Sequence, residues 1–357
     1  MASPSPSAAP PAPGPVIITG HGRSGSNRVL DLFDCSAVTL CRNEPNEVPG
    51  SALAGLPDGF FFEDRGPDFE DALLDALAVA ARSFSTRDRI GTSPKAWVPA
   101  WQRRVVGRGL LARGRLRGLL APVAPGLARE EVTPGMLYGG ARLDGAVPVF
   151  KILLSQGWLC GLLEARADFR VVHNIRDPHG FARSWWTRYL GPRDRARVFA
   201  ECMVSVPRVL EELGGVPGDL SGPTDEALVE AEMWRWRYAN EPLFVRYGDH
   251  PRYRHVLYAE ASRDAGALAR SLFAFAGLPY GAEERGRVLS MTNTMFATRP
   301  DVAPLDDAVL ERVVQRVMDG SPLNALFDVD RRLAPAAPRA EGERRKAGLG
   351  AAVPQPG

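Results

Sequence analysis

Several features that would place this chain in a familiar class are scarce in its sequence. It has only four cysteines, and none of them belongs to a Cys-x-x-Cys pair, so neither a zinc site nor a redox motif is indicated. We therefore expect the four cysteines to be reduced thiols, as in most cytoplasmic proteins. The formal net charge of +2 is too small to indicate a nucleic-acid partner, and we expect none.

Long apolar runs and a secretory start are also missing. No run approaches the roughly 18 apolar residues that a membrane-spanning helix requires. Residues 1–14 are rich in proline, alanine and serine and lack the basic start and apolar core of a signal peptide, so they predict a disordered leader. Residues 331–357, rich in alanine, proline and arginine, predict a disordered tail. We therefore expect a cytoplasmic protein whose folded domain occupies residues 15–330.

The folded part alternates short β-branched runs with segments of helical apolar spacing. Strands are predicted over residues 16–19, 37–41, 147–154, 169–175 and 255–258, and helices over 27–33, 69–84, 157–167, 227–240 and 265–277. This alternation favours an α/β fold with a central parallel sheet that helices cover on both faces. Ligands of such sheets bind at the carboxyl ends of the strands, so we sought a site in the loops that follow them.

The first of these loops has the spacing of a phosphate-binding loop. Gly20 and Gly25 enclose four residues between a strand and a helix, so backbone N–H groups and the helix N-terminus can turn toward an anion. A triphosphate-binding loop carries lysine and a hydroxyl where Ser26 and Asn27 stand, whereas the cation here is Arg23. The pattern suits a phosphate and a neighbouring charged group without magnesium. The alternative is a tight turn before a serine-capped helix.

A second loop follows the strand FRVVHNI. Its sequence Arg176-Asp177-Pro178 provides a helix N-cap in Asp177 and a proline at the first helical position. The helix places Ser184 a little under two turns from its start, where Arg176 and Ser184 could hold one phosphate from two sides. The alternative is an ordinary capped helix in which Arg176 pairs with Asp177.

Together the two loops resemble the sulfotransferases that use 3′-phosphoadenosine 5′-phosphosulfate (PAPS). In that family a strand–loop–helix element binds the 5′-phosphosulfate, and an Arg…Ser pair eight positions apart binds the 3′-phosphate; Arg176 and Ser184 have this spacing. The segment GRSGSNRVLDLF is most similar to the carbohydrate sulfotransferase branch. That branch also has a Glu-Pro pair about 21 positions beyond its loop arginine, as Glu44-Pro45 stands beyond Arg23.

The resemblance implies a phosphate-loop-like fold and a PAPS-dependent transferase that releases adenosine 3′,5′-bisphosphate (PAP) and needs no metal. Tyr258–Pro279 is similar to the C-terminal element of the family. The sequence departs from the family's pattern at Asn27, His179 and Ala259. The residues that the resemblance assigns to the cofactor are Gly22, Arg23, Ser24, Gly25, Ser26 and Asn27, with Arg176 and Ser184. Arg299, in the stretch NTMFATRP, is a further candidate that could close over the cofactor phosphates.

Sulfuryl transfer requires a cation near the bridging oxygen and a base for the proton of the acceptor. Arg23 is the expected charge-stabilising residue. Glu44 is the first choice for the base, with Glu47 and His21 as alternatives. The competing structural role of Glu44 is an ion pair with Arg42 or Arg23.

Two polar residues interrupt otherwise apolar strands. Lys151, in VFKILL, is included in the catalytic set, because an ammonium at this position could reach the sulfuryl group. The alternative is that its side chain points outward. His173, in FRVVHNI, is expected to be a satisfied core histidine. Trp185, Trp186, Trp234 and Trp236 are expected to pack the core; the alternative is that one of them stacks on adenine.

The acceptor is expected to be a hydroxyl-bearing carbohydrate, a glycolipid or a small natural product, because the first loop resembles that of enzymes acting on sugars. Residues 60–145 match no motif, and we expect this insertion to shape the acceptor site. Within it, residues 102–120 are rich in arginine and leucine. This pattern suits peripheral contact with a membrane surface or an acidic acceptor; the alternative is a solvated lid or insertion without a charged partner. The sequence does not indicate an oligomeric state.

Two other classes compete with the sulfotransferase hypothesis. A nucleotide-dependent kinase or another phosphate-loop phosphotransferase would need the Lys-Ser/Thr pair and a strand that ends in a magnesium-binding aspartate. A non-catalytic anion-binding module would need neither the pair Arg176 and Ser184 nor Glu44. We therefore predict an enzyme of the PAPS-dependent sulfotransferase type.

Overall fold

The computed structural model describes residues 14–327, apart from residue 64 and the segments 84–87, 92–94, 99–131, 135–142, 144, 165–167, 192 and 292–303. Several predictions therefore concern residues outside the described part of the chain. These are nearly all of the predicted leader, the whole predicted tail, most of the predicted insertion including residues 102–120, and Arg299.

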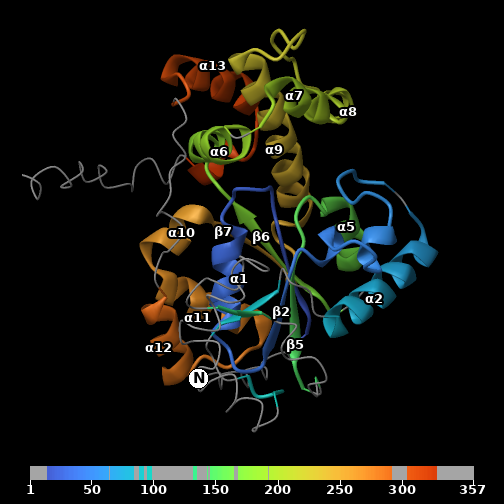
Figure 1. The fold of residues 1–357 in the computed structure, drawn as a ribbon, viewed down its shortest axis with the longest axis vertical. Coiled ribbons are helices and arrows are strands. Elements are labelled where there is room, and N and C mark those ends of the chain that lie inside the picture. Colours follow the sequence, from blue (N-terminus) through green and yellow to red (C-terminus); the bar gives the residue numbers. More distant parts are fainter. Residues whose placement is uncertain are drawn as a thin grey trace, which may run out of the picture.

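Five parallel strands form the central sheet in the order β2-β5-β1-β6-β7 (Figure 1). Its register places Val16 opposite both Val149 and Arg170. The predicted α/β fold with a central parallel sheet is confirmed. The strands are β1 (Val16–Thr19), β2 (Thr39–Asn43), β5 (Val147–Lys151), β6 (Arg170–Ile175) and β7 (Tyr253–Leu257), and a separate antiparallel pair joins β3 (Arg89–Gly91) to β4 (Val132–Pro134).

Helices cover both faces of this sheet, as the sequence predicts. Val16 and Ile18 pack with two of the helices, whereas Ile17 packs with two others, because successive side chains of a strand point to opposite faces. The first pair is α1 (Ser26–Asp34) and α11 (Ala265–Ala276), and the second pair is α2 (Pro67–Arg82) and α5 (Gln156–Glu164). Two further helices on the same side as α11 are α10 (Tyr258–Arg263) and α12 (Ala282–Ser290) (Figure 1).

A third group of helices lies beyond the carboxyl ends of the strands, at the top of Figure 1. Trp185, Trp234 and Trp236 are buried in its core, which confirms their packing role. The sequence predicted α6 and the middle of α9 but not the others. The group consists of α6 (Pro178–Trp185), the π-helical turn Trp186–Leu190, α7 (Arg195–Met203), α8 (Val206–Leu213), α9 (Asp225–Tyr247) and α13 (Asp307–Met318).

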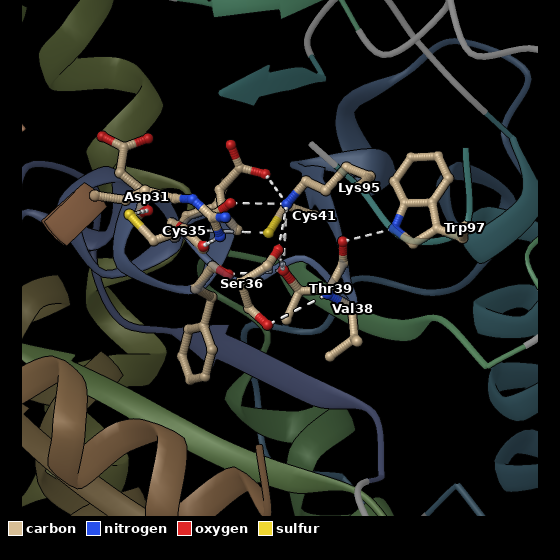
Figure 2. A network of polar contacts seen from close by, with 12 residues as sticks. Asp31, Cys35, Ser36, Val38, Thr39, Cys41, Lys95 and Trp97 are labelled. Atoms are coloured by element: carbon tan, nitrogen blue, oxygen red, sulfur yellow. Dashed lines mark hydrogen bonds and ion pairs between the residues drawn. The ribbon is translucent and has the colours of Figure 1, made fainter. Parts of the chain in front are cut away.

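Strand β2 begins at Thr39, two residues later than predicted, because the preceding residues form a turn around a buried lysine. Figure 2 shows Lys95 reaching into this turn. Its ammonium lies 2.7 Å from Asp34 Oδ1 and 2.9 Å from the backbone oxygen of Ser36. The hydroxyl of Thr39 turns back and donates to the carbonyl of Phe33 at 2.7 Å.

Two global features bear on the sequence predictions. All four cysteines are buried and free, so none of them forms a disulfide. Burial also raises the pKa of each thiol, to about 12 for Cys35 and to about 11 for Cys160, which keeps them unreactive. Within the described ranges, no helix has the length and apolar character needed to cross a membrane.

Candidate active site

The carboxyl ends of all five strands carry residues of the candidate site. β1 runs into the loop Gly20–Gly25, β2 is followed by Glu44, and β5 ends in Lys151. Arg176 follows β6, and Tyr258 follows β7. Because parallel strands end at one edge of the sheet, residues from five distant parts of the chain meet there.

The first loop has a conformation that requires glycine at its end. Gly25 has a φ of 93° and occupies the N-cap of α1 without a side-chain hydrogen bond. A Cβ atom at this position would lie 2.3 Å from the ring of Tyr258. The hydroxyl of Ser24 is used inside the loop, where it donates to the His21 carbonyl at 2.6 Å. The alternative of a serine-capped turn is therefore wrong. No serine side chain caps the first N–H groups of α1, and uncapped N–H groups of this kind bind anions at other helix N-termini.

Three arginines converge beside this loop. Arg176 Nη1 donates to the backbone oxygen of Arg23 at 3.1 Å, and its guanidinium lies 4.4 Å from the ring centre of Tyr258. Burial lowers the pKa of Arg23, and the charges of Arg188 and Arg176 lower it further. The Nε atoms of Arg23 and Arg176 are buried without a hydrogen-bond partner in the described part of the chain. Like charges held together with unused donors indicate an anion-binding site.

The second loop forms the predicted helix cap. Asp177 Oδ1 accepts from the N–H of Gly180 at 2.6 Å, and Pro178 follows as the first residue of α6. Arg176 turns toward Arg23 and the adjacent tyrosine ring. Burial lowers the pKa of Arg176, and the electrostatic interactions with Tyr258 and Asp177 oppose this effect. Ser184 lies half-buried further along α6. Its contact with a phosphate stays a prediction.

Lys151 is 3% exposed and points into the protein. Its ammonium donates to the amide oxygens of Asn27 at 2.6 Å and Asn43 at 3.0 Å, and to Glu44 Oε1 at 2.7 Å. It thus connects the ends of β5 and β2 to the start of α1. Glu44 pairs with this lysine, whereas Arg42, one of its expected partners, donates to carbonyls at the end of α2.

A cavity of about 520 Å³ opens beside the first loop. Arg23 lies on its wall and also belongs to the arginine cluster, so it stands between the cavity and the anion-binding position. The other predicted residues on the wall are His21, Gly22, Glu44 and Glu47. Trp185, one of the tryptophans expected to pack, also lies on the wall. Wall residues that the sequence did not single out include Phe60, Trp158, Tyr189, Glu232 and Arg235.

The two strand-associated histidines have different surroundings. His173 is fully buried between the hydroxyl of Tyr253 at 2.6 Å and Oδ1 of Asn240 at 2.8 Å, which confirms the predicted core histidine. His21, in the loop after β1, has its Nε2 atom 3.5 Å from Glu232 Oε1. Burial lowers the pKa of His21, and the charge of Glu232 opposes this effect. A neutral imidazole beside a carboxylate is suited to proton transfer.

Three charged residues at the site escaped the sequence analysis. Arg188 lies on the π-helical turn, a type of distortion that is frequent at functional sites. Glu232 and Arg235 are charged residues within the largely buried helix α9. Because charged residues are seldom buried unless they are paired, their presence in such a helix could have indicated a specific interaction. Among the described residues, no group of three or more histidine, cysteine or acidic side chains could hold a metal ion.

Comparisons with known proteins show distant similarity. No protein-family model matches the chain. A Marinobacter nauticus protein named undecaprenyl-diphosphatase is 28% identical over 134 residues, which are 36% of this chain and 51% of that protein. The chain thus spans about half the length of the curated relative it matches.

Solved sulfotransferase structures are similar over most of the chain. One from Mycobacterium avium has 15% identity and a TM-score of 0.36, and covers 87% of this chain and 78% of its own. One from Alicyclobacillus acidocaldarius has 16% identity and a TM-score of 0.37, with 88% and 98% covered. The sulfotransferase domain of the Synechococcus PCC 7002 olefin synthase has 15% identity and a TM-score of 0.35, with 92% and 99% covered. Similarity at this level defines neither donor nor acceptor.

Proposed function

We propose that this protein is a PAPS-dependent sulfotransferase that moves the sulfuryl group to a hydroxyl of an acceptor bound in the cavity. The observation that carries the proposal is the convergence of Arg23, Arg176 and Arg188 on a strand–loop–helix element that lacks the triphosphate lysine. PAPS has two separate anionic ends, and a loop with a nearby arginine cluster offers a position for each.

The proposed donor contacts divide between the two ends. The loop residues Gly22 to Asn27, with Arg23, hold the 5′-phosphosulfate, while Arg176, Ser184 and Arg188 hold the 3′-phosphate. Arg299 is proposed as a further phosphate contact. A free 3′-phosphate distinguishes PAPS from ATP, so the arginine cluster also provides selectivity for the donor.

The proposed reaction is an in-line displacement at sulfur. The acceptor oxygen bonds to sulfur, the bond between sulfur and the bridging oxygen breaks, and its electron pair leaves on PAP. In this proposal Arg23 stabilises the negative charge that develops on that oxygen. Lys151 holds Asn27 and Glu44, and we propose that it aligns the loop and the sulfuryl group. The acceptor proton passes to one of Glu44, Glu47 and His21, all on the wall of the cavity.

The cavity supports an acceptor of moderate size. Its aromatic side chains, Phe60, Trp158 and Tyr189, suit stacking against a sugar or another ring. We therefore propose a carbohydrate, a glycolipid or a small natural product as acceptor. The reaction as proposed requires no metal.

Thermal unfolding in the presence of nucleotides tests this function. A ligand at about 100 times its dissociation constant stabilises the folded state by about 2.7 kcal/mol, so PAP should raise Tm clearly. Adenosine 5′-phosphosulfate, which lacks the 3′-phosphate, should stabilise less. Stabilisation by ATP with magnesium and none by PAP would overturn the proposal in favour of a kinase.

Variants of the arginine cluster sharpen this test. Arg176→Ala and Arg188→Ala should each weaken PAP binding roughly 10- to 100-fold, because each removes a charge-assisted hydrogen bond of about 1.5–3 kcal/mol. Arg197→Ala is the matched control, since its side chain is 81% exposed on α7. PAP binding that is equally strong in all three variants would contradict the placement of the 3′-phosphate.

A further inference from the structure

The wall of the cavity holds three buried polar atoms that have no hydrogen-bond partner among the described residues. They are His21 Nε2, Trp185 Nε1 and Arg235 Nε. His21 is 3% exposed and Trp185 is 2% exposed. Because buried polar groups are nearly always hydrogen-bonded, three such atoms in one wall indicate a position where a bound molecule supplies the missing partners.

These atoms have complementary hydrogen-bonding roles. The indole N–H of Trp185 and the Nε–H of Arg235 can only donate. His21 Nδ1 lies 3.2 Å from the carbonyl of Gly22. Since a carbonyl only accepts, we assign the hydrogen of the neutral imidazole to Nδ1, which leaves a lone pair on Nε2. A hydroxyl group can therefore accept a hydrogen bond from the indole or from the guanidinium, and it can donate one to the imidazole.

Glu232 is held beside the Nε2 atom of the imidazole. Its Oε2 atom accepts from Arg235 Nη1 at 2.7 Å and from Cys202 Sγ at 3.4 Å, which holds the carboxylate in one orientation. Its Oε1 atom lies 3.5 Å from His21 Nε2. A proton that arrives on Nε2 therefore faces a buried carboxylate, which stabilises the imidazolium.

We propose that His21, backed by Glu232, is the base that takes the proton of the acceptor hydroxyl. This inference rests on the proposed sulfotransferase function. As the acceptor oxygen bonds to sulfur and PAP leaves with the electron pair of the bridging oxygen, the hydroxyl proton moves to His21 Nε2. Glu44, whose carboxylate is bound to Lys151 at 2.7 Å, is then a positioning residue for that lysine.

The titratable groups around His21 set the pH response of the reaction. They are Glu232 and Arg235 on α9, with Cys202 on α7 and Tyr189 on the π-helical turn facing the carboxylate. His21 must be neutral to accept a proton, so turnover should fall on the acid side of its pKa. Because the negative charge of Glu232 favours the protonated imidazole, Glu232→Gln should move this acid limb to lower pH.

Release of PAP from PAPS with water as the acceptor tests the inference without an identified acceptor. His21→Asn should lower this rate at least about 100-fold, the lower end of the usual contribution of a general base. Glu232→Gln should lower it less and shift the acid limb as stated. Glu44→Gln should keep measurable turnover. His250→Asn, a histidine outside the cavity wall, is the control. Wild-type rates in His21→Asn would overturn the inference, and an inactive Glu44→Gln would then identify Glu44 as the base.

Two further measurements separate the possible failures. PAP should still raise the Tm of His21→Asn, which would also show that this variant is folded. If His21→Asn does not fold, His21→Gln is used in its place. If the wild-type protein neither binds PAP nor releases it from PAPS, the proposed function itself fails.

Nitrogen-15 NMR of the wild-type imidazole of His21 at neutral pH reports its tautomer directly. A hydrogen on Nδ1 with a bare Nε2 is expected, and a hydrogen on Nε2 would overturn the role of His21 even where turnover is too slow to measure.

Discussion

Glu44 and Lys151 are joined twice, once by their side chains and once by their backbones. The ammonium and the carboxylate lie 2.7 Å apart, and the N–H of Glu44 donates to the carbonyl of Lys151 at 2.8 Å. Glu44 has a left-handed φ of 52°, a conformation that costs a non-glycine residue roughly 1–3 kcal/mol and persists where the surroundings impose it. The double connection therefore fixes the end of β2 next to the first loop.

Replacing the lysine should loosen this edge of the sheet. Lys151→Met removes the ammonium from three oxygen atoms, and we expect a loss of about 1–3 kcal/mol in the free energy of unfolding. PAP binding should weaken as well, because Asn27 at the start of α1 loses its anchor. Urea unfolding and the Tm increase with PAP measure the two effects. A variant that matches the wild type in both would show that the bridge does not organise the loop.

The contact between Gly25 and Tyr258 predicts a second effect. In Gly25→Ala the new Cβ would lie 2.3 Å from the ring at a φ of 93°, so the loop and the ring cannot keep their present positions. We expect PAP to lose its effect on Tm. Gly222→Ala is the matched control, because a Cβ there meets nothing within 4 Å.

A double variant identifies the cause of that loss. Gly25→Ala combined with Tyr258→Ala removes the clash but keeps the strained φ. Partial recovery of PAP binding relative to Gly25→Ala alone is expected. If Gly25→Ala binds PAP as tightly as the control, the loop conformation is not needed for the anion.

Local patterns in the sequence predicted the parts of the structure that local physics determines. The β-branched run Val16–Thr19 forms β1 with the predicted bounds, and Asp177 followed by proline starts α6 as predicted. The parallel sheet follows from the alternation of such elements. The residues Arg23, Glu44 and the loop glycines could be found because they lie in recognisable spacings next to strand ends.

Pairings between distant segments could not be predicted in this way. His21 meets Glu232 only because α9 packs across the carboxyl ends of the strands, and no sequence spacing encodes that approach. The start of β2 was placed two residues too early because the sequence does not show that Lys95 enters the preceding turn. The pairing of Glu44 with Lys151 was not predictable either, because the partners considered for its structural role were Arg42 and Arg23, and Arg42 binds the end of α2 instead.

A third prediction concerns the buried ion pair of Lys95, the lysine shown in Figure 2. Lys95 is fully buried, and the side chain of Asp34 beside it is 10% exposed. Lys95→Met leaves a buried carboxylate without its ammonium, and breaking a buried ion pair in this way costs about 3–5 kcal/mol. Urea unfolding should show this loss. The double variant Lys95→Met with Asp34→Asn should be less destabilised than the single one; equal or additive losses would contradict the pairing.

His173 predicts how stability depends on pH. Burial lowers the pKa of this imidazole from 6.5 to about 3, so it is neutral in the folded protein, whereas the unfolded chain takes up a proton below pH 6.5. The stabilisation is therefore complete above the unfolded pKa and is lost as pH falls from 6.5 toward 3, with a slope of up to about 1.4 kcal/mol per pH unit. Burial lowers the pKa of His21 also, which adds a slope of the same sign.

Urea unfolding at several pH values between about 7 and about 5 measures this slope. His173→Gln should be less stable than the wild type at neutral pH, because it disturbs the contacts with Tyr253 and Asn240, but its stability should fall less steeply with acid. The difference between the two slopes should approach one proton, since the variant has no imidazole to titrate at this position. Parallel curves for the two proteins would mean that His173 takes up a proton in the folded state as readily as in the unfolded chain, which its two hydrogen bonds and complete burial oppose.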